Sequence, residues 1–332
     1  MNIYTPSYFD TFRCIAGACP DSCCKEWAVQ VDEGSAAYYR SLPGPLGERL
    51  REVLRDEDGE TVMTITDGRC PMWRHDGLCR IQAELGEEAL CKTCREFPRL
   101  THDFGNFVEL GLELSCPEAA KYILNAPNAP LLAQELPGEG EAECDEEAMA
   151  LLLATRQEVL ALLSDPARPI GDTLALTLLY GCEVQSCLDS GEEPVFDPDS
   201  ALETAKSMAK SGDPQEMLDF FSNLELLTPE WEMLLGSPAP GPWDGCIPAL
   251  ARYLVNRYWL QAVSDYDLYS RVKFILIACL LVKTLGGDIL RTAQLWSKEI
   301  ENDADNIDAL LDAAYTHPAF TDDKLLGMLL NE

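Results

Sequence analysis

Apolar residues recur with a helical period over most of the chain beyond residue 145. Apolar positions three and four apart are typical of amphipathic helices. The longest purely apolar run, Phe274 to Val282, has nine residues, whereas a membrane span needs about 20. We therefore interpret it as part of a buried helix in an all-helical C-terminal domain. The expected helices cover 145–163, 171–188, 200–210, 214–227, 246–263, 268–285, 289–302 and 307–315.

The first part of the chain has shorter and more mixed patterns. Alternating residues predict a strand at Trp27 to Asp32, and the β-branched run Thr61 to Thr66 predicts another. Pro117 stands where the first residue of a helix is expected, directly after Ser115-Cys116. Other expected helices cover 35–39, 46–55, 81–85 and 87–94, and 107–114 is expected to be extended.

An acidic segment separates these two parts. Gln134 to Glu147 contains seven acidic residues, two glycines, one proline and no basic residue, a composition typical of linkers. We therefore expect a cysteine-rich metal-binding domain at 1–133, a linker at 134–147 and an all-α domain at 148–332. The predicted fold class is mainly α, with short strands in the N-terminal region.

Fourteen cysteines change this picture, because nine of them lie in the first 116 residues. A disulfide between adjacent Cys23 and Cys24 is strained, and short spacings that converge from distant segments indicate thiolate ligation of a metal. The N-terminus lacks a basic region followed by an apolar one, so we expect no signal peptide and a cytoplasmic location. A reducing compartment disfavours structural disulfides and favours a metal. The clustered cysteines are Cys14, Cys19, Cys23, Cys24, Cys70, Cys79, Cys91, Cys94 and Cys116.

The spacing leaves the metal's identity open between zinc and iron–sulfur, because soft thiolates suit both. The first group reads C-x4-C-x3-C-C, which is neither ordinary zinc-finger spacing nor the C-x3-C-x2-C run of radical enzymes. His75 and His102 lie in the same region. They could be metal ligands or proton shuttles, but surface residues are the safer interpretation. The sequence contains no phosphate-binding loop and no dinucleotide fingerprint.

The formal net charge of −32 argues against binding to nucleic acid, which needs clustered Lys and Arg, and against an anionic membrane. A partner with exposed lysines would be attracted, although acidity also serves solubility. Arg95 follows Cys94 directly. An arginine there could neutralise the thiolates or hold a carboxylate at two points, and Arg95 is our candidate for binding a cofactor. Tyr253 and Tyr258 pack in the core or line a pocket.

Several blocks along the chain form a recognisable pattern: Phe12–Cys19, Cys23–Trp27, Val31–Asp32, Cys70–Trp73, Gly77–Ile81, Thr93–Arg99, Leu114–Ala120, Leu295–Glu301 and Asn306–Leu310. Together they closely resemble the flagellin lysine-N-methylase family. The cysteine half also resembles proteins that chelate zinc or iron through a C-x2-C-x2-C-C opening; eight cysteines match that pattern and Cys91 does not. The expected metal ligands are Cys14, Cys19, Cys23, Cys24, Cys70, Cys79, Cys94 and Cys116.

The resemblance implies methyl transfer from S-adenosylmethionine to lysine amines of flagellin, with a 4Fe-4S cluster, or zinc, at the cysteines. It identifies neither the general base nor the S-adenosylmethionine pocket. The alternatives are a non-enzymatic metal-chelating or redox-sensing protein, and a scaffold that binds flagellin without modifying it. The helical half favours an enzyme, because a chelating module needs only the first ~130 residues at typical domain sizes.

Overall fold

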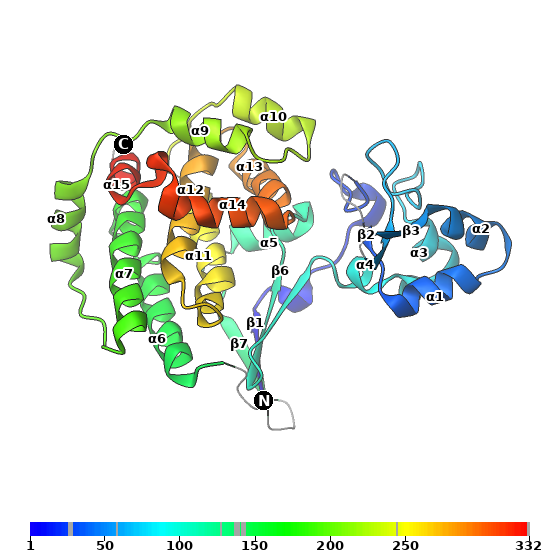
Figure 1. The fold of residues 1–332 in the computed structure, drawn as a ribbon, viewed down its shortest axis with the longest axis horizontal. Coiled ribbons are helices and arrows are strands. Elements are labelled where there is room, and N and C mark those ends of the chain that lie inside the picture. The colour runs from blue at the N-terminus through cyan, green and yellow to red at the C-terminus, as the bar shows by residue number, and fades with distance from the viewer. Residues whose placement is uncertain are drawn as a thin grey trace.

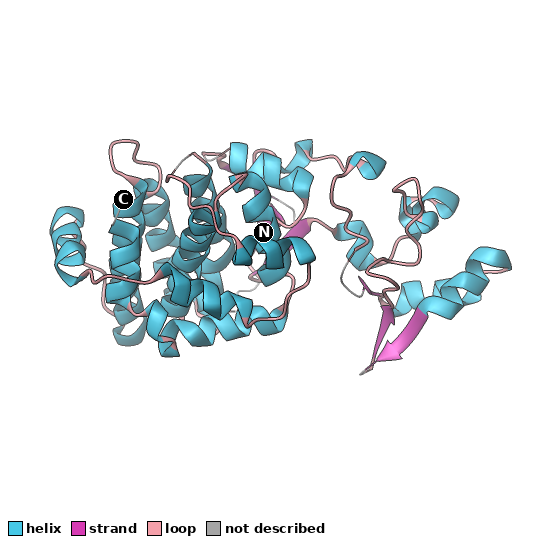
Figure 2. Cartoon of the chain, turned by 90° about the horizontal axis from the view of Figure 1, so that it is seen from above, coloured by secondary structure: helices cyan, strands magenta, loops and turns pink. Residues whose placement is uncertain are grey.

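The structure is a computed structural model that describes residues 1–25, 29–57, 59–126, 128–135, 140, 144–243 and 245–330. Two lobes are visible in Figures 1 and 2. We call residues 14–97 the small lobe, and residues 1–12 and 98–330 the helical body. Each lobe has its own cluster of buried apolar side chains.

The helical body confirms the prediction of a helical C-terminal half. Helix α12 begins and ends where the sequence predicts and is buried along nearly its whole length, including Phe274 to Val282. Helices α10 and α15 were not predicted. No helix in the described ranges is both long enough and apolar enough to span a membrane. The helices are α6 (Glu146–Leu162), α7 (Ile170–Ser190), α8 (Pro198–Met208), α9 (Pro214–Ser222), α10 (Pro229–Gly236), α11 (Cys246–Tyr258), α12 (Leu268–Leu285), α13 (Ile289–Trp296), α14 (Ala304–Thr316) and α15 (Asp322–Leu330), with short helical turns η4 (Trp259–Val263), η5 (Ser297–Glu301) and η6 (Pro318–Phe320).

A four-stranded sheet packs against these helices and includes the N-terminal strand (Figure 1). Its order is β5-β6-β1-β7, and β1 runs parallel to β6 with Ile3 opposite Val108. Only β6 was predicted, within the extended segment 107–114. The elements are β1 (Asn2–Pro6), η1 (Phe9–Thr11), β5 (Arg99–Asp103), β6 (Phe107–Leu112), α5 (Pro117–Asn125) and β7 (Leu131–Glu135).

The small lobe packs short helices on a three-stranded sheet of order β2-β4-β3. The predicted strand at 27–32 is confirmed as β2, although residues 26–28 lie outside the described residues. The predicted helices at 35–39 and 81–85 are found. The predicted helix at 46–55 ends at Val53, because Leu54 and Arg55 pair with β4 as part of β3, and the predicted helix at 87–94 is divided into η3 and α4. The elements are η2 (Ala16–Ala18), β2 (Val29–Gln30), α1 (Glu33–Ser41), α2 (Gly44–Val53), β3 (Leu54–Glu57), β4 (Glu60–Met63), α3 (Arg80–Leu85), η3 (Glu87–Ala89) and α4 (Lys92–Glu96).

The division of the chain between the two clusters of buried apolar side chains does not fall at residue 133, the predicted domain boundary. Phe12, Phe107 and Cys116 are buried in the same cluster as the C-terminal helices. β7 also extends into the predicted linker, of which residues 136–139 and 141–143 lie outside the described residues. Whether 1–133 and 148–332 fold as separate domains stays a prediction.

Candidate functional site

Nine cysteines form two neighbouring groups, one in the small lobe and one between the lobes, and all are free thiols. Members of each group lie close enough for their charges to interact. The larger group, in the small lobe, contains Cys23, Cys24, Cys70, Cys79, Cys91 and Cys94. The second group, between the lobes, contains Cys14, Cys19 and Cys116.

Sulfur atoms in the larger group interact in pairs. Cys23 and Cys70 both hydrogen-bond to the sulfur of Cys24, and these bonds lower the pKa of Cys24 to about 3. The thiol of Cys94 does the same for Cys91, whose pKa falls to about 7. These contacts favour the thiolate only at Cys24 and Cys91, because the same interactions, together with burial, raise the pKa of Cys23, Cys70 and Cys94. The thiolate is the form that binds metals.

The smaller group is contributed by both lobes. Cys116 is buried at the start of α5 in the helical body. Cys14 and Cys19 flank η2, and the thiol of Cys19 donates to the carbonyl oxygen of Asp21 at 3.1 Å. Burial raises the pKa of Cys116 to about 11. A cation shared by these sulfurs would join the small lobe to the helical body.

The donor type fits a thiolate-bound metal, but its ligands are not prearranged. Within the described residues, no three Cys, His, Asp or Glu side chains converge as a group that could hold a metal ion. The eight expected ligands therefore stay a prediction. Cys91, which the sequence comparison left out, is buried and contacts the expected ligand Cys94.

The other expected site residues near the thiols differ in exposure. Arg95 is exposed on α4, and its side chain makes no ion pair or hydrogen bond within the described residues. Its role in cofactor binding stays a prediction. His75 is exposed, as the safer interpretation expected, whereas His102 is half-buried on β5.

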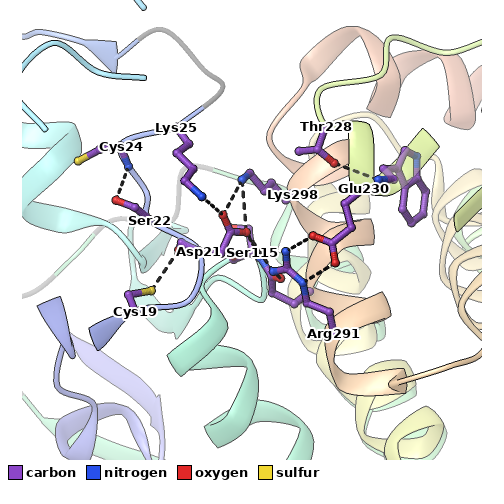
Figure 3. Close-up of polar contacts among 12 residues, drawn as sticks. Cys19, Asp21, Ser22, Cys24, Lys25, Ser115, Thr228, Glu230, Arg291 and Lys298 are labelled. Carbon is purple, nitrogen blue, oxygen red and sulfur yellow. Dashed lines mark hydrogen bonds and ion pairs between the residues drawn. The ribbon is translucent and has the colours of Figure 1, made fainter. Parts of the chain in front are cut away.

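A buried carboxylate fastens the first cysteine segment to the helical body (Figure 3). Asp21, between Cys19 and Cys23, is 7% exposed. One of its oxygens accepts from Arg291 Nη1 at 3.0 Å and the other from Lys298 Nζ at 3.1 Å. Despite its burial, these two cations lower the pKa of Asp21.

A cleft of about 230 Å³ separates this thiol region from the helical body. Cys23, Thr93 and Cys94 line it on the small-lobe side, and Glu113 and Asn302 line it on the other. Burial raises the pKa of Glu113, which makes its carboxylate a stronger base than that of an exposed glutamate. Asn302 Nδ2 is buried in the cleft wall without a hydrogen-bond partner among the described residues.

A buried ionic network lies behind Glu113. Glu301 accepts from Tyr258 Oη at 2.9 Å and pairs with Arg257 at 3.2 Å. Tyr253 Oη accepts from the backbone N–H of Leu114, the residue after Glu113, at 3.3 Å. Glu301 ends η5, a π-helical turn, and such turns are frequent at functional sites. The network fixes the backbone beside Glu113.

Local sequence patterns missed Asp21 and Glu113. Asp21 lies between two cysteines, but its cationic partners are more than 260 residues away. Glu113 lies inside the segment 107–114 that was expected to be extended, and its closeness in sequence to Cys116 was the signal that could have pointed to it. Tyr253 and Tyr258 are buried, as expected for core packing.

Together these features define a mainly helical protein with a thiol-rich lobe set against a charged, partly buried cleft. The chain is 32% identical over 145 residues to the flagellar biosynthetic protein FliU of Salmonella muenchen, covering 41% of this chain and 84% of that protein. It is equally similar to the lysine-N-methylases of Salmonella typhimurium and Salmonella choleraesuis, of which it covers 35%. No family model and no solved structure matches the chain.

The chain belongs to the family that includes FliU and lysine-N-methylase, because it covers most of FliU at this identity. It spans about a third of the length of the two lysine-N-methylases.

Proposed function

We propose that this chain transfers methyl groups from S-adenosylmethionine to lysine side chains of flagellin. The observation that carries the proposal is the cleft that brings Glu113 and Asn302 opposite the thiols Cys23 and Cys94. Its relatives named lysine-N-methylase support the reaction type, and the relative named as a flagellar biosynthetic protein supports flagellin as the substrate.

Glu113 is the proposed general base. A lysine ammonium has no lone pair, so it must lose a proton before it can attack a methyl group. The carboxylate of Glu113 would accept that proton, and its raised pKa makes it a stronger base than an exposed glutamate. The amine nitrogen then bonds to the methyl carbon as the carbon–sulfur bond breaks, which leaves methyl-lysine and S-adenosylhomocysteine.

Two polar groups of the cleft would position the substrate. Asn302 Nδ2, which has no hydrogen-bond partner among the described residues, would donate to a backbone carbonyl of the flagellin chain. The hydroxyl of Thr93 donates to the carbonyl oxygen of Gln30 at 2.9 Å, so its oxygen is free to accept. The apolar ring of Phe97 also lines the cleft and suits the aliphatic part of a lysine side chain.

The thiols would hold a metal centre beside this cleft. The proposed ligands of an iron–sulfur cluster are drawn from Cys14, Cys19, Cys23, Cys24, Cys70, Cys79, Cys94 and Cys116. When bound, such a cluster supplies a redox-active, Lewis-acidic centre.

A Glu113→Gln variant tests the proposal. Loss of a general base lowers kcat by about 100-fold or more, and it should remove the fall in rate that the parent shows at acidic pH. The matched control is Glu118→Gln, since Glu118 pairs with Lys121 on α5 and lies outside the cleft lining. Parent-like kcat and pH profile in Glu113→Gln would rule out Glu113 as the base.

A further inference from the structure

A second cavity lies inside the helical body, between the sheet and α11. Leu100 and His102 of β5 and Leu110 of β6 line one wall, and Arg252 and Asn256 of α11 line the other. None of the nine clustered cysteines lines it. Its volume is about 70 Å³, which is room for several water molecules or for one small polar group of a ligand.

Arg252 lines this cavity, and so does Glu109, whose carboxylate is already paired with Arg156. Its Nη1 donates to the carbonyl oxygen of Leu160 at 2.5 Å and to the hydroxyl of Ser164. Its Nε is buried and has no hydrogen-bond partner in the ranges that the structure describes. In the described part of the chain, Arg252 forms no ion pair. The Nε and Nη2 edge of a guanidinium is a fork that matches a carboxylate or phosphate.

The two neighbouring arginines differ from Arg252 in this respect. Arg156 makes two hydrogen bonds to Glu109, at 2.8 and 2.6 Å, and Arg257 pairs with Glu301 at 3.2 Å. These two pairs are neutral overall, so the charge of Arg252 is left over. An uncompensated, partly buried cation is unexpected in a chain of net charge −32, and burying a charge is unfavourable unless it is paired.

Two further polar atoms near the cavity lack partners. Asn256 Oδ1 and His102 Nε2 are both buried and make no hydrogen bond within the described residues. Burial also lowers the pKa of His102, so its ring is neutral at pH 7. Buried polar atoms are nearly always hydrogen-bonded in native proteins. A ligand with N–H or O–H groups would supply the missing bonds.

We propose that this cavity binds a small molecule whose carboxylate or phosphate group is held by Arg252. Asn256 accepts a hydrogen bond from an N–H or O–H group of the same molecule. The site does not depend on the proposed function. If that function holds, the carboxylate of S-adenosylmethionine is one source of the anion, and a free phosphate is the other.

Calorimetric titration of the full chain tests the proposal with three probes: S-adenosylhomocysteine, 5′-methylthioadenosine, which lacks the amino-acid group, and inorganic phosphate. Arg252→Met should weaken binding of S-adenosylhomocysteine or phosphate by about 10- to 100-fold, because a hydrogen-bonded charge is lost. Asn256→Leu removes no hydrogen bond within the described protein and should weaken binding about 3- to 10-fold. Binding of 5′-methylthioadenosine should be the same in all proteins.

The matched control is Arg168→Met, which removes an arginine already paired with Asp165 and Asp199; it should bind like the parent. The proposal is overturned if no probe binds, or if every probe binds the parent and both cavity variants equally. If S-adenosylhomocysteine does not bind but phosphate binding depends on Arg252, the cavity proposal stands and the proposed cosubstrate fails. If S-adenosylhomocysteine binds independently of Arg252 and phosphate does not bind, the cavity proposal fails and the proposed function stands.

Discussion

The buried carboxylate of Asp21 should hold the cysteine segment against the helical body, and Asp21→Asn tests this at nearly constant volume. Asp21 is 7% exposed and Lys298 is 2% exposed. Breaking a fully buried ion pair costs about 3–5 kcal/mol. The Arg291 side chain is 31% exposed, so solvent screens part of the interaction, and we expect a loss of about 2–4 kcal/mol.

The pH dependence follows from the lowered pKa of Asp21. A carboxyl group whose pKa is lower in the folded state stabilises the fold above its unfolded pKa of about 3.9, and this contribution is lost as pH falls through the folded pKa. The difference in stability between parent and variant should therefore be constant from about pH 7 to about pH 5 and should shrink below about pH 4.

Urea unfolding under anaerobic, reducing conditions measures this difference, and thiol labelling of Cys19 provides a local measure. Cys19 should react faster in Asp21→Asn, because the segment is released. Asp10→Asn, which changes an exposed acid in the same N-terminal region, should match the parent in both assays. If Asp21→Asn is as stable as Asp10→Asn at pH 7, the reasoning about this ion pair is refuted.

Two further predictions concern the metal and the substrate. Cys24→Ala should lose bound iron and acid-labile sulfide, because Cys24 interacts with both Cys23 and Cys70. The control Cys182→Ala, on α7, should keep its iron and sulfide. Equal metal content in the two variants would remove Cys24 from the ligand set. The apparent second-order rate constant on folded flagellin should fall as the salt concentration rises, because screening over roughly 10 Å at 0.1 M salt weakens attraction to a chain of net charge −32. The rate constant on a short neutral lysine peptide should change much less. Equal salt dependence for both substrates would mean that the acidity does not steer the substrate.

Much of the helical body was predictable because helical periodicity is a local signal. α12 carries an uninterrupted apolar run, and its ends were predicted correctly. α10 was missed although it has its own start signal, since Thr228 accepts from the backbone N–H of Trp231 and Pro229 follows at the first helical position. It has only eight residues, and a helix this short shows too few repeats of apolar positions for a periodic pattern to be recognised.

The strands of the larger sheet were harder to predict because their partners are distant in sequence. β1 pairs with β6 and β7, which lie more than 100 residues away, and no local pattern reports such pairing. The candidate site likewise contains features that local sequence predicts and features that depend on distant residues. Cysteine spacing predicted that thiols gather, but Asp21, Glu113 and Arg252 acquire their roles only from residues that the fold brings to them.

The most direct test of the proposed function is to measure methyl transfer itself. The full chain, purified anaerobically with its iron and sulfide analysed, is incubated with flagellin and S-adenosylmethionine carrying a deuterated methyl group, and the flagellin is examined by mass spectrometry. The account predicts deuterated methyl groups on lysine side chains, with far fewer in Glu113→Gln than in Glu118→Gln. Metal-loaded protein that leaves flagellin unlabelled would contradict it and favour a metal-chelating protein without this activity.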